Sequence, residues 1–183
     1  MQKEHFDIVV IGSGPAGEAA AINAKKKGRT VAVVCDLEFV GGSCTHYGTI
    51  PSKALRHSVK EVMQFNANPM FRDLGDARKL SFQQVSKHAD RVVYEQVQMR
   101  TDFYDRNHIP IFKGRASFLD KNTVKLAGKR KKLSATSFII ATGSSPYHPP
   151  GVDFSHDRVF DSDTILNMDY SPRKVTIMGA GVI

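Results

Sequence analysis

Residues 6–17 read FDIVVIGSGPAG. The first six form a short apolar run rich in β-branched residues, which predicts a buried strand that ends in a glycine-rich turn. An alanine-rich helical stretch follows at residues 18–27, Gly28 is a stop signal, and a second buried strand is expected at residues 30–34. This order of strand, G-x-G-x-x-G loop, helix and strand predicts a βαβ unit and therefore an α/β fold.

The glycine loop has the spacing of a dinucleotide-binding turn. Gly12 permits the tight turn, Gly14 lets a pyrophosphate approach the backbone, and Gly17 lets the helix pack closely on the strand. Pro15 and Ala16 lie at the helix start, where free N–H groups and the positive end of the helix dipole favour a phosphate. These residues predict a dinucleotide-binding site but do not identify the dinucleotide.

Residues 41–55 carry a second pattern, GGSCTHYGTIPSKAL. Flavoprotein disulfide reductases have the motif GG-x-C-x4-C-x-P-[ST]-K, and the chain resembles that family. The matching residues are Gly41, Gly42, Cys44, Pro51, Ser52 and Lys53. Thr49 stands where the family has its second cysteine, and threonine cannot form the disulfide that a cysteine pair forms. We therefore expect the scaffold of a dithiol site without its chemistry.

Further segments resemble one branch of that family, the soluble pyridine nucleotide transhydrogenases. These are CTHYGTIPSKALRH at 44–57, YDRNH at 104–108, GSSPYHP at 143–149 and DSDTIL at 161–166. The resemblance covers the whole chain but only the N-terminal portion of such a protein. It implies FAD at the first glycine loop, NAD(P) at a second loop, 179–181, and hydride transfer between NADPH and NAD through FAD. It also implies a homo-oligomer for the intact protein.

The resemblance assigns individual residues to the cofactors. It places Lys53 beside N5 of the flavin, where the lysine would stabilise negative charge on the reduced ring together with a glutamate beyond Ile183; the alternative is an ordinary exposed helix lysine. The implied FAD contacts are Gly12, Gly14, Pro15, Ala16, Gly17, Cys35, Asp36, Gly41, Gly42, Ser43, Cys44, Lys53, Ala116, Thr142 and Gly143. Gly179 and Gly181 are the implied NAD(P) contacts.

The ribose position has more than one interpretation. Dinucleotide sites place an acidic residue about 20 positions beyond the loop to bind the ribose hydroxyls. Counted back from Cys44, the acid of the family falls on Cys35, and Asp36 follows one place later. In one interpretation a local shift of the backbone lets Asp36 bind the ribose hydroxyls. In another the ribose is held without Asp36. In the third, Asp36 is simply a solvated loop residue. Cys35 itself ends a buried strand and is expected to be a small hydrophobe.

Cys44 also has two interpretations. A lone thiol at a helix start can have a depressed pKa and raised reactivity. Without a partner it cannot store a disulfide, so a packed, uncatalytic cysteine is the alternative. His46 and His57 flank the segment, but no His/Cys/Asp group has zinc spacing, and we predict no metal.

The remaining pattern extends the α/β domain. Helices are expected at residues 51–64 and 82–107 around a loop at 66–80, followed by a β-meander at 109–112, 116–119, 123–126 and 131–134 and a buried strand at 138–143. We predict a doubly wound, Rossmann-like FAD-binding domain over 1–150 with the meander inserted. A connecting segment follows at 151–172. Residues 173–183 are expected to begin a truncated NAD(P)-binding domain with its first strand, which would make the chain a fragment.

Composition limits the other function classes. The net charge of +8 could suit nucleic acid, but the basic residues are scattered apart from 25–27 and 129–132, so a solvated positive surface is favoured. Two cysteines and no signal segment suggest the cytoplasm, and no apolar run is long enough to span a membrane. The alternatives are a dihydrolipoamide dehydrogenase-like reductase without its dithiol, a non-catalytic FAD-binding fragment, and a basic nucleic-acid module.

Overall fold

The computed structural model describes residues 3–72 and 80–181. The chain divides into two compact units, one formed by Met1–His46 with Glu95–Ser144 and the other by Tyr47–Tyr94 with Ser145–Ile183. The predicted boundaries at residues 150 and 172 stay predictions.

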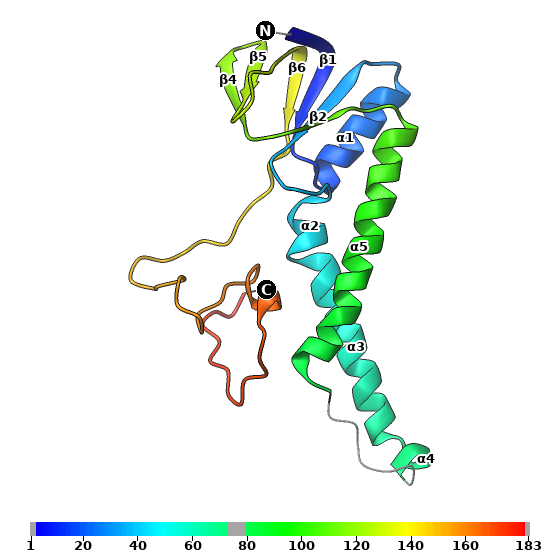
Figure 1. The fold of residues 1–183 in the computed structure, drawn as a ribbon, viewed down its shortest axis with the longest axis vertical. Helices are drawn as coiled ribbons and strands as arrows, with labels where there is room; N and C mark the ends of the chain where they lie inside the picture. Colours follow the sequence, from blue (N-terminus) through cyan, green and yellow to red (C-terminus); the bar gives the residue numbers. More distant parts are fainter. Residues whose placement is uncertain (1–2, 73–79, 182–183) are drawn as a thin grey trace. The chain divides into compact units, whose positions relative to one another are not determined.

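The first unit is built on a six-stranded sheet with the strand order β3-β2-β1-β6-β5-β4. The labels β2, β1, β6, β5 and β4 in Figure 1 follow this order across the sheet. The strands are β1 Lys3–Ile11, β2 Val31–Cys35, β3 Ile111–Lys113, β4 Ala116–Asp120, β5 Thr123–Leu126 and β6 Lys132–Ile140. Its helices are α1 Pro15–Lys26, α2 Gly42–His46 and the last part of α5 Phe82–Arg106, which begins in the second unit. The α/β prediction is confirmed, and both long crossovers, α1 and α5, join parallel strands.

The parallel centre of the sheet explains its apolar sequence. Every residue of β2, VAVVC, is buried, as expected of a parallel strand covered on both faces. Val10 of β1 pairs with Val33 on one side and with Ile139 of β6 on the other. Because β1 runs for nine residues, it supplies a partner along the whole of β6.

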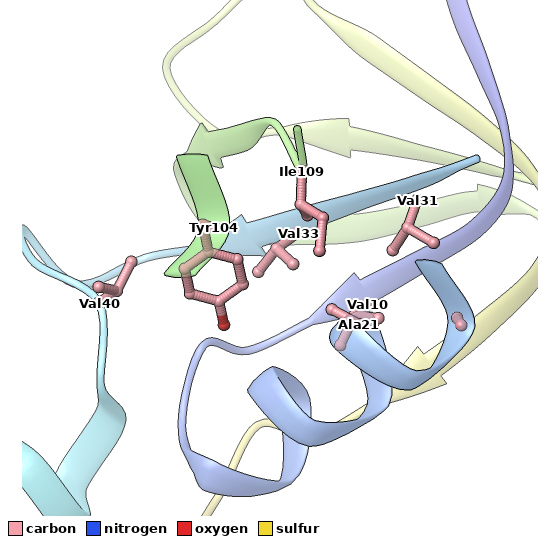
Figure 2. Close-up of a cluster of buried hydrophobic side chains, with 8 residues drawn as sticks. Val10, Ala21, Val31, Val33, Val40, Tyr104 and Ile109 are labelled. Carbon is pink, nitrogen blue, oxygen red and sulfur yellow. The ribbon is translucent and has the colours of Figure 1, made fainter. Parts of the chain in front are cut away.

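Two apolar clusters cover the two faces of the sheet. Figure 2 shows the first, in which Tyr104 from the end of α5 packs with strand and helix residues. The first cluster contains Val10, Ala21, Ala24, Val31, Val33, Val40, Tyr104 and Ile109. The second contains Val9, Ala32, Val34, Val124, Leu126, Leu133 and Ala135. Helices therefore cover one face, whereas the buried residues of the opposite cluster all come from strands.

The predicted meander needs correction. Residues 109–112 were expected to belong to it, but β3 pairs in parallel with β2 and extends the central sheet. The predicted strands at 131–134 and 138–143 are one strand, β6, which pairs with β1 along its length and with antiparallel β5 at its start. The antiparallel part thus consists of β4, β5 and the first residues of β6. The same strand β6 pairs with β5 on one side and with β1 on the other.

The second unit is helical and irregular. It contains α3 Thr49–Ala67, α4 Pro69–Arg72, the first part of α5 and a short 3₁₀ helix, Ile165–Asn167. The Ser81 N–H donates to the Gln84 side chain and the Gln84 N–H donates to Ser81 Oγ, which is a capping box at the start of α5. The predicted loop at 66–80 is wrong at 66–67, where α3 continues, and at 69–72, where α4 forms. Residues 73–79 of that loop lie outside the described residues.

The strand expected near residues 173–178 is not formed. Residues 172–180 have no helix or strand in the structure, and Val175, Ile177 and Met178 are 64%, 83% and 90% exposed. A parallel strand forms only where neighbouring strands pair with it and a crossover element covers its faces. The described part of the second unit offers no strand to pair with.

Candidate dinucleotide site

The carboxyl ends of three strands meet at one edge of the first unit. The Gly12 N–H donates to the Val34 carbonyl at the end of β2 (2.8 Å), and the Ala141 N–H after β6 donates to the Ile11 carbonyl of β1 (2.8 Å). The carboxyl edge of a parallel sheet is where α/β proteins bind ligands. The glycine loop therefore lies in the position that its sequence predicts.

Two glycines of the loop are required by the chain itself. Gly12 has a φ of +111°, and a Cβ there would lie 2.1 Å from the Ala141 carbonyl oxygen. A Cβ on Gly17 would lie 2.0 Å from the Gly12 carbonyl oxygen, because α1 begins directly against the turn. No side chain fits at either position without moving the backbone.

Gly14 is different. Its φ of −70° suits any residue, and a Cβ there would meet nothing closer than the Gly42 Cα at 3.7 Å, an ordinary contact. The chain's own packing therefore does not explain why this position is glycine. A pyrophosphate that approaches the backbone does explain it, so the loop fits a dinucleotide such as FAD.

The first turn of α1 is left open to an anion. Gly14 is the N-cap, no side chain caps the helix, and Pro15 occupies the first helical position. The Ser13 hydroxyl, which precedes the cap, instead lies 2.9 Å from Cys35 Sγ. Pro15 and Ala16 are exposed. Free first-turn N–H groups and the positive helix end are what a phosphate requires.

Residues 41–44 form a second wall of this site. The Gly41 N–H donates to the Ser13 carbonyl (3.1 Å), and a Cβ on Gly42, whose φ is +60°, would lie 2.7 Å from the Gly14 Cα. Ser43 Oγ donates to the Ser144 carbonyl (3.5 Å). Cys44 is partly buried in α2. The structure thus brings three distant segments together at the loop.

The ribose position contains a buried thiol. Cys35 is 2% exposed at the end of β2, and its Sγ also contacts the carbonyl oxygens of Leu37 (3.6 Å) and Phe39 (3.8 Å). Asp36 is exposed and lies just beyond the strand. The last residue of β2 is therefore a buried thiol and the next residue an exposed carboxylate, and the choice between Cys35 and Asp36 as the ribose contact stays a prediction.

Three further predicted contacts lie in the first unit. Thr142 and Gly143 are exposed just after β6, and Gly143 has a φ of +72°. Ala116 begins β4 and packs against the second apolar cluster. Gly114, two residues earlier, donates its N–H to the Cys35 carbonyl (2.9 Å), which ties this segment to the carboxyl end of β2.

Lys53, Gly179 and Gly181 belong to the second unit. Lys53 is exposed in the first turns of α3. Gly179 has a φ of +136°, and a Cβ on either glycine would meet no atom of residues 3–72 and 80–181 within 4 Å. The strand that should lead into this second glycine loop is not formed, so their assignment to NAD(P) stays a prediction.

Sequence reasoning missed a charged pair beside the loop. Arg100 Nη1 of α5 lies 2.6 Å from Glu18 Oε2 in the first turn of α1, with the two side chains 12% and 15% exposed. Burial raises the pKa of the nearby Tyr104 hydroxyl well above its usual range, and the charge of Glu18 raises it further. Glu18 directly follows the glycine motif, but no sequence signal indicates its partner 82 positions away.

The described residues also limit other kinds of site. In residues 3–72 and 80–181, no three His, Cys, Asp or Glu side chains gather in a way that could hold a metal ion. None of the helices in that part of the chain has the length and apolar character needed to cross a membrane.

Comparison with known proteins agrees with this site. Residues 6–183 match the family model described as pyridine nucleotide-disulphide oxidoreductase. The soluble pyridine nucleotide transhydrogenases of Pseudomonas aeruginosa (strain LESB58) and Ectopseudomonas mendocina (strain ymp) are 55% and 57% identical over 98% of the chain. The chain spans 39% of the length of either relative.

A solved structure shares the fold. The HOCl-induced flavoprotein disulfide reductase RclA from Escherichia coli superposes with a TM-score of 0.72 over 88% of this chain and 34% of its own, at 24% identity. The family match over nearly the whole chain, the glycine loop at the carboxyl edge and the relatives agree with one another. The chain belongs to the pyridine nucleotide-disulphide oxidoreductase family.

Proposed function

We propose that the chain is the FAD-binding part of an enzyme that transfers hydride between NADPH and NAD. The observation that carries this proposal is Gly14: a Cβ there would meet no atom of the described residues closer than 3.7 Å, whereas a pyrophosphate that approaches the backbone favours glycine at this position. Relatives named soluble pyridine nucleotide transhydrogenase, at 55% to 57% identity, support the choice of reaction. We infer a cytoplasmic homo-oligomer for the full-length protein, with NAD(P) at Gly179 and Gly181 and no nucleic-acid partner.

Each residue of the site would have a limited task. The first turn of α1 would hold the pyrophosphate at Gly14, with Gly42 and Ser43 as the opposite wall. Bound there, FAD supplies the capacity to take up and release a hydride, which links oxidation of NADPH to reduction of NAD. The protein's contribution is to hold the dinucleotide in one position.

Thr49 distinguishes the proposed activity from that of a disulfide reductase. It is the first residue of α3 and is exposed, and its hydroxyl cannot replace the sulfur of a dithiol. Without a dithiol, electrons from NADPH would leave as a hydride to a second nicotinamide. A dihydrolipoamide dehydrogenase-like activity is therefore disfavoured.

Lys53 is the proposed catalytic residue, where its ammonium would stabilise negative charge on the reduced flavin. Lys53→Met should lower the NADPH-to-NAD rate by about tenfold or more, because a fixed cation at developing charge is a large catalytic term. Lys60→Met is the matched control, since Lys60 is also exposed on α3, and it should leave the rate unchanged. Equal effects of the two variants would contradict the role of Lys53.

Two alanine substitutions in one loop test the dinucleotide site. In the full-length protein, Gly14→Ala should leave the fold stable and weaken FAD binding on the order of tenfold, because the methyl group occupies the space of the pyrophosphate. Gly17→Ala should instead destabilise the fold, since its Cβ meets the Gly12 carbonyl at 2.0 Å. Flavin fluorescence and thermal unfolding measure the two effects. Unchanged FAD retention in stable Gly14→Ala would refute the placement.

A further inference from the structure

A largely buried ion pair lies at the helix end that would receive the pyrophosphate. Glu18 is in the first turn of α1, and its N–H donates to the Gly14 carbonyl (2.9 Å). Arg100 on α5 reaches Glu18 at 2.6 Å, and only 12% and 15% of the two side chains are exposed. Both residues belong to the first unit, so the pair joins the glycine-loop helix to the crossover helix within one compact body.

The charge of Glu18 is in competition with a bound phosphate. A carboxylate in the first turn of a helix interacts favourably with the positive helix end, the same end that a pyrophosphate uses. Glu18 follows Gly14 by four residues, which is about one helical turn. Because the carboxylate is mostly buried, solvent and salt screen its repulsion of a nearby phosphate poorly. An unpaired Glu18 would therefore oppose dinucleotide binding.

Arg100 is suited to cancel that charge. A guanidinium stays protonated at any working pH, so the pair has no net charge. Its Nε is buried and has no hydrogen-bond partner in the described part of the chain. A side chain placed only to connect two helices would be expected to satisfy this donor, because a buried unpaired N–H is costly. The position of Arg100 therefore places a positive charge beside Glu18 but leaves one of its hydrogen-bond donors unsatisfied.

We propose that Arg100 is a positioning residue that acts through Glu18: it neutralises the carboxylate and so keeps the positive end of α1 available to the pyrophosphate of the dinucleotide. This inference rests on the proposed function, since it assumes that FAD binds at Gly14. Arg100 would then affect cofactor affinity although it lies outside the glycine motif. Its effect on the cofactor would be electrostatic, through the charge at the N-terminal end of α1.

The test compares the FAD dissociation constants of charge variants of the full-length protein, measured by titration of the apoprotein. Arg100→Met should weaken FAD binding about tenfold, because Glu18 is left uncompensated. Glu18→Gln should tighten FAD binding about threefold, because the positive charge of Arg100 is then unopposed. The double variant should return to near the wild-type affinity. Arg100→Lys, which keeps the charge without the planar fork, should retain affinity and covers the case in which Arg100→Met does not fold.

Glu4→Gln is the matched control. Glu4 forms an ion pair with Lys131 (2.9 Å) in the same unit, on β1 near its amino end and away from the loop. This variant removes the same charge from a paired glutamate, and FAD affinity should not change. Opposite signs for the two halves of the Glu18–Arg100 pair support the inference, since loss of a merely structural link would weaken FAD binding in both variants.

The outcomes are separable. If Glu18→Gln weakens FAD binding in step with a loss of thermal stability, or if neither single variant changes the affinity, the role of Arg100 is wrong while the proposed function stands. If the unmodified full-length protein binds no FAD, the proposed function itself fails and the inference fails with it.

Discussion

At the scale of single residues, the glycines of one loop serve different physical ends. Gly12 and Gly17 are needed because neighbouring backbone oxygens occupy the space of a side chain, whereas a Cβ on Gly14 would meet no described atom closer than 3.7 Å, and we propose that a ligand uses this space. The same residue type therefore has opposite experimental consequences at positions two or three residues apart. Loss of the first two should affect folding, and loss of the third should affect binding.

We predict that Gly12→Ala will be far more destabilising than Gly28→Ala. Both glycines have a positive φ, +111° and +75°, so both substitutions strain the backbone by about 1 kcal/mol. At Gly12 the added Cβ also meets a backbone oxygen, at 2.1 Å, while at Gly28 it meets no atom of the described part of the chain within 4 Å. Urea unfolding of the two variants measures the difference. Similar losses would show that the clash is relieved by movement of the segment after β6.

We predict that Cys44 is dispensable for hydride transfer between nicotinamides. Thr49 stands where the motif has its second cysteine, so Cys44 lacks the partner of a dithiol relay, and Cys44→Ser in the full-length protein should keep most of the NADPH-to-NAD rate. Thiol-blocking reagents should inhibit weakly. The assay is run in parallel with lipoamide and glutathione disulfide as acceptors, and robust turnover of either disulfide would contradict the transhydrogenase proposal.

Asp161 gives a pH-dependent prediction in the second unit. Burial would raise the pKa of its carboxyl, but hydrogen bonds from His148 (2.6 Å) and Thr164 outweigh burial and lower it to about 2. A depressed folded-state pKa stabilises the fold above the ordinary value of 3.8, and the contribution, about 1–2 kcal/mol, is lost as the pH falls from about 4 to 2. In Asp161→Asn, the melting temperature should therefore depend less on pH between about pH 4 and pH 2.

The control for this prediction is Asp157→Asn, since Asp157 is 87% exposed. It should leave the dependence of the melting temperature on pH nearly unchanged. An unaltered profile in Asp161→Asn would show that its hydrogen bonds do not persist in solution.

At the scale of elements, the end of α5 is attached to the sheet by one aromatic side chain. Tyr104 is fully buried between strand and helix residues of the first cluster (Figure 2), and its hydroxyl has no hydrogen-bond partner in the part of the chain that the structure describes. The ring therefore stabilises the crossover, while the hydroxyl costs free energy.

We predict that Tyr104→Phe will stabilise the fold by about 1 kcal/mol, because it removes an unpaired buried hydroxyl and keeps the ring. Tyr104→Ala should cost about 3–5 kcal/mol through the cavity that it leaves. Denaturant unfolding of both variants tests this. A destabilising Tyr104→Phe would reveal a hydrogen-bond partner, such as a buried water, for the hydroxyl.

At the scale of the whole molecule, the two units differ in how their apolar residues are covered. The first has a buried cluster on each face of its sheet. In the second, Val175, Ile177 and Met178 are more than half exposed. We predict that Ile177→Lys will reduce concentration-dependent association of the 183-residue chain, measured by light scattering, because it interrupts this apolar patch. Lys174→Gln, the control, should not reduce it.

The sequence was sufficient where local pattern and motif spacing carry the information. Periodicity and turn residues predict the buried strands β1 and β2, the glycine loop, and the two long helices α3 and α5. The structure confirms these elements. Thr49 in place of the second cysteine of the C-x4-C motif directed the proposed chemistry away from disulfides. These features depend on residues close together in the chain, so local rules apply to them.

Tertiary structure decided what depends on distant partners. Residues 131–143 carry the same apolar pattern whether they form two strands or one, and only the long partner β1 makes β6 continuous. The run at 174–178 has strand propensity but no neighbour to pair with in the described residues, so it stays irregular. Glu18 and Arg100 meet because two crossover helices pack on one face of the sheet. Pairing and packing are non-local, and a sequence pattern specifies them only through the fold as a whole.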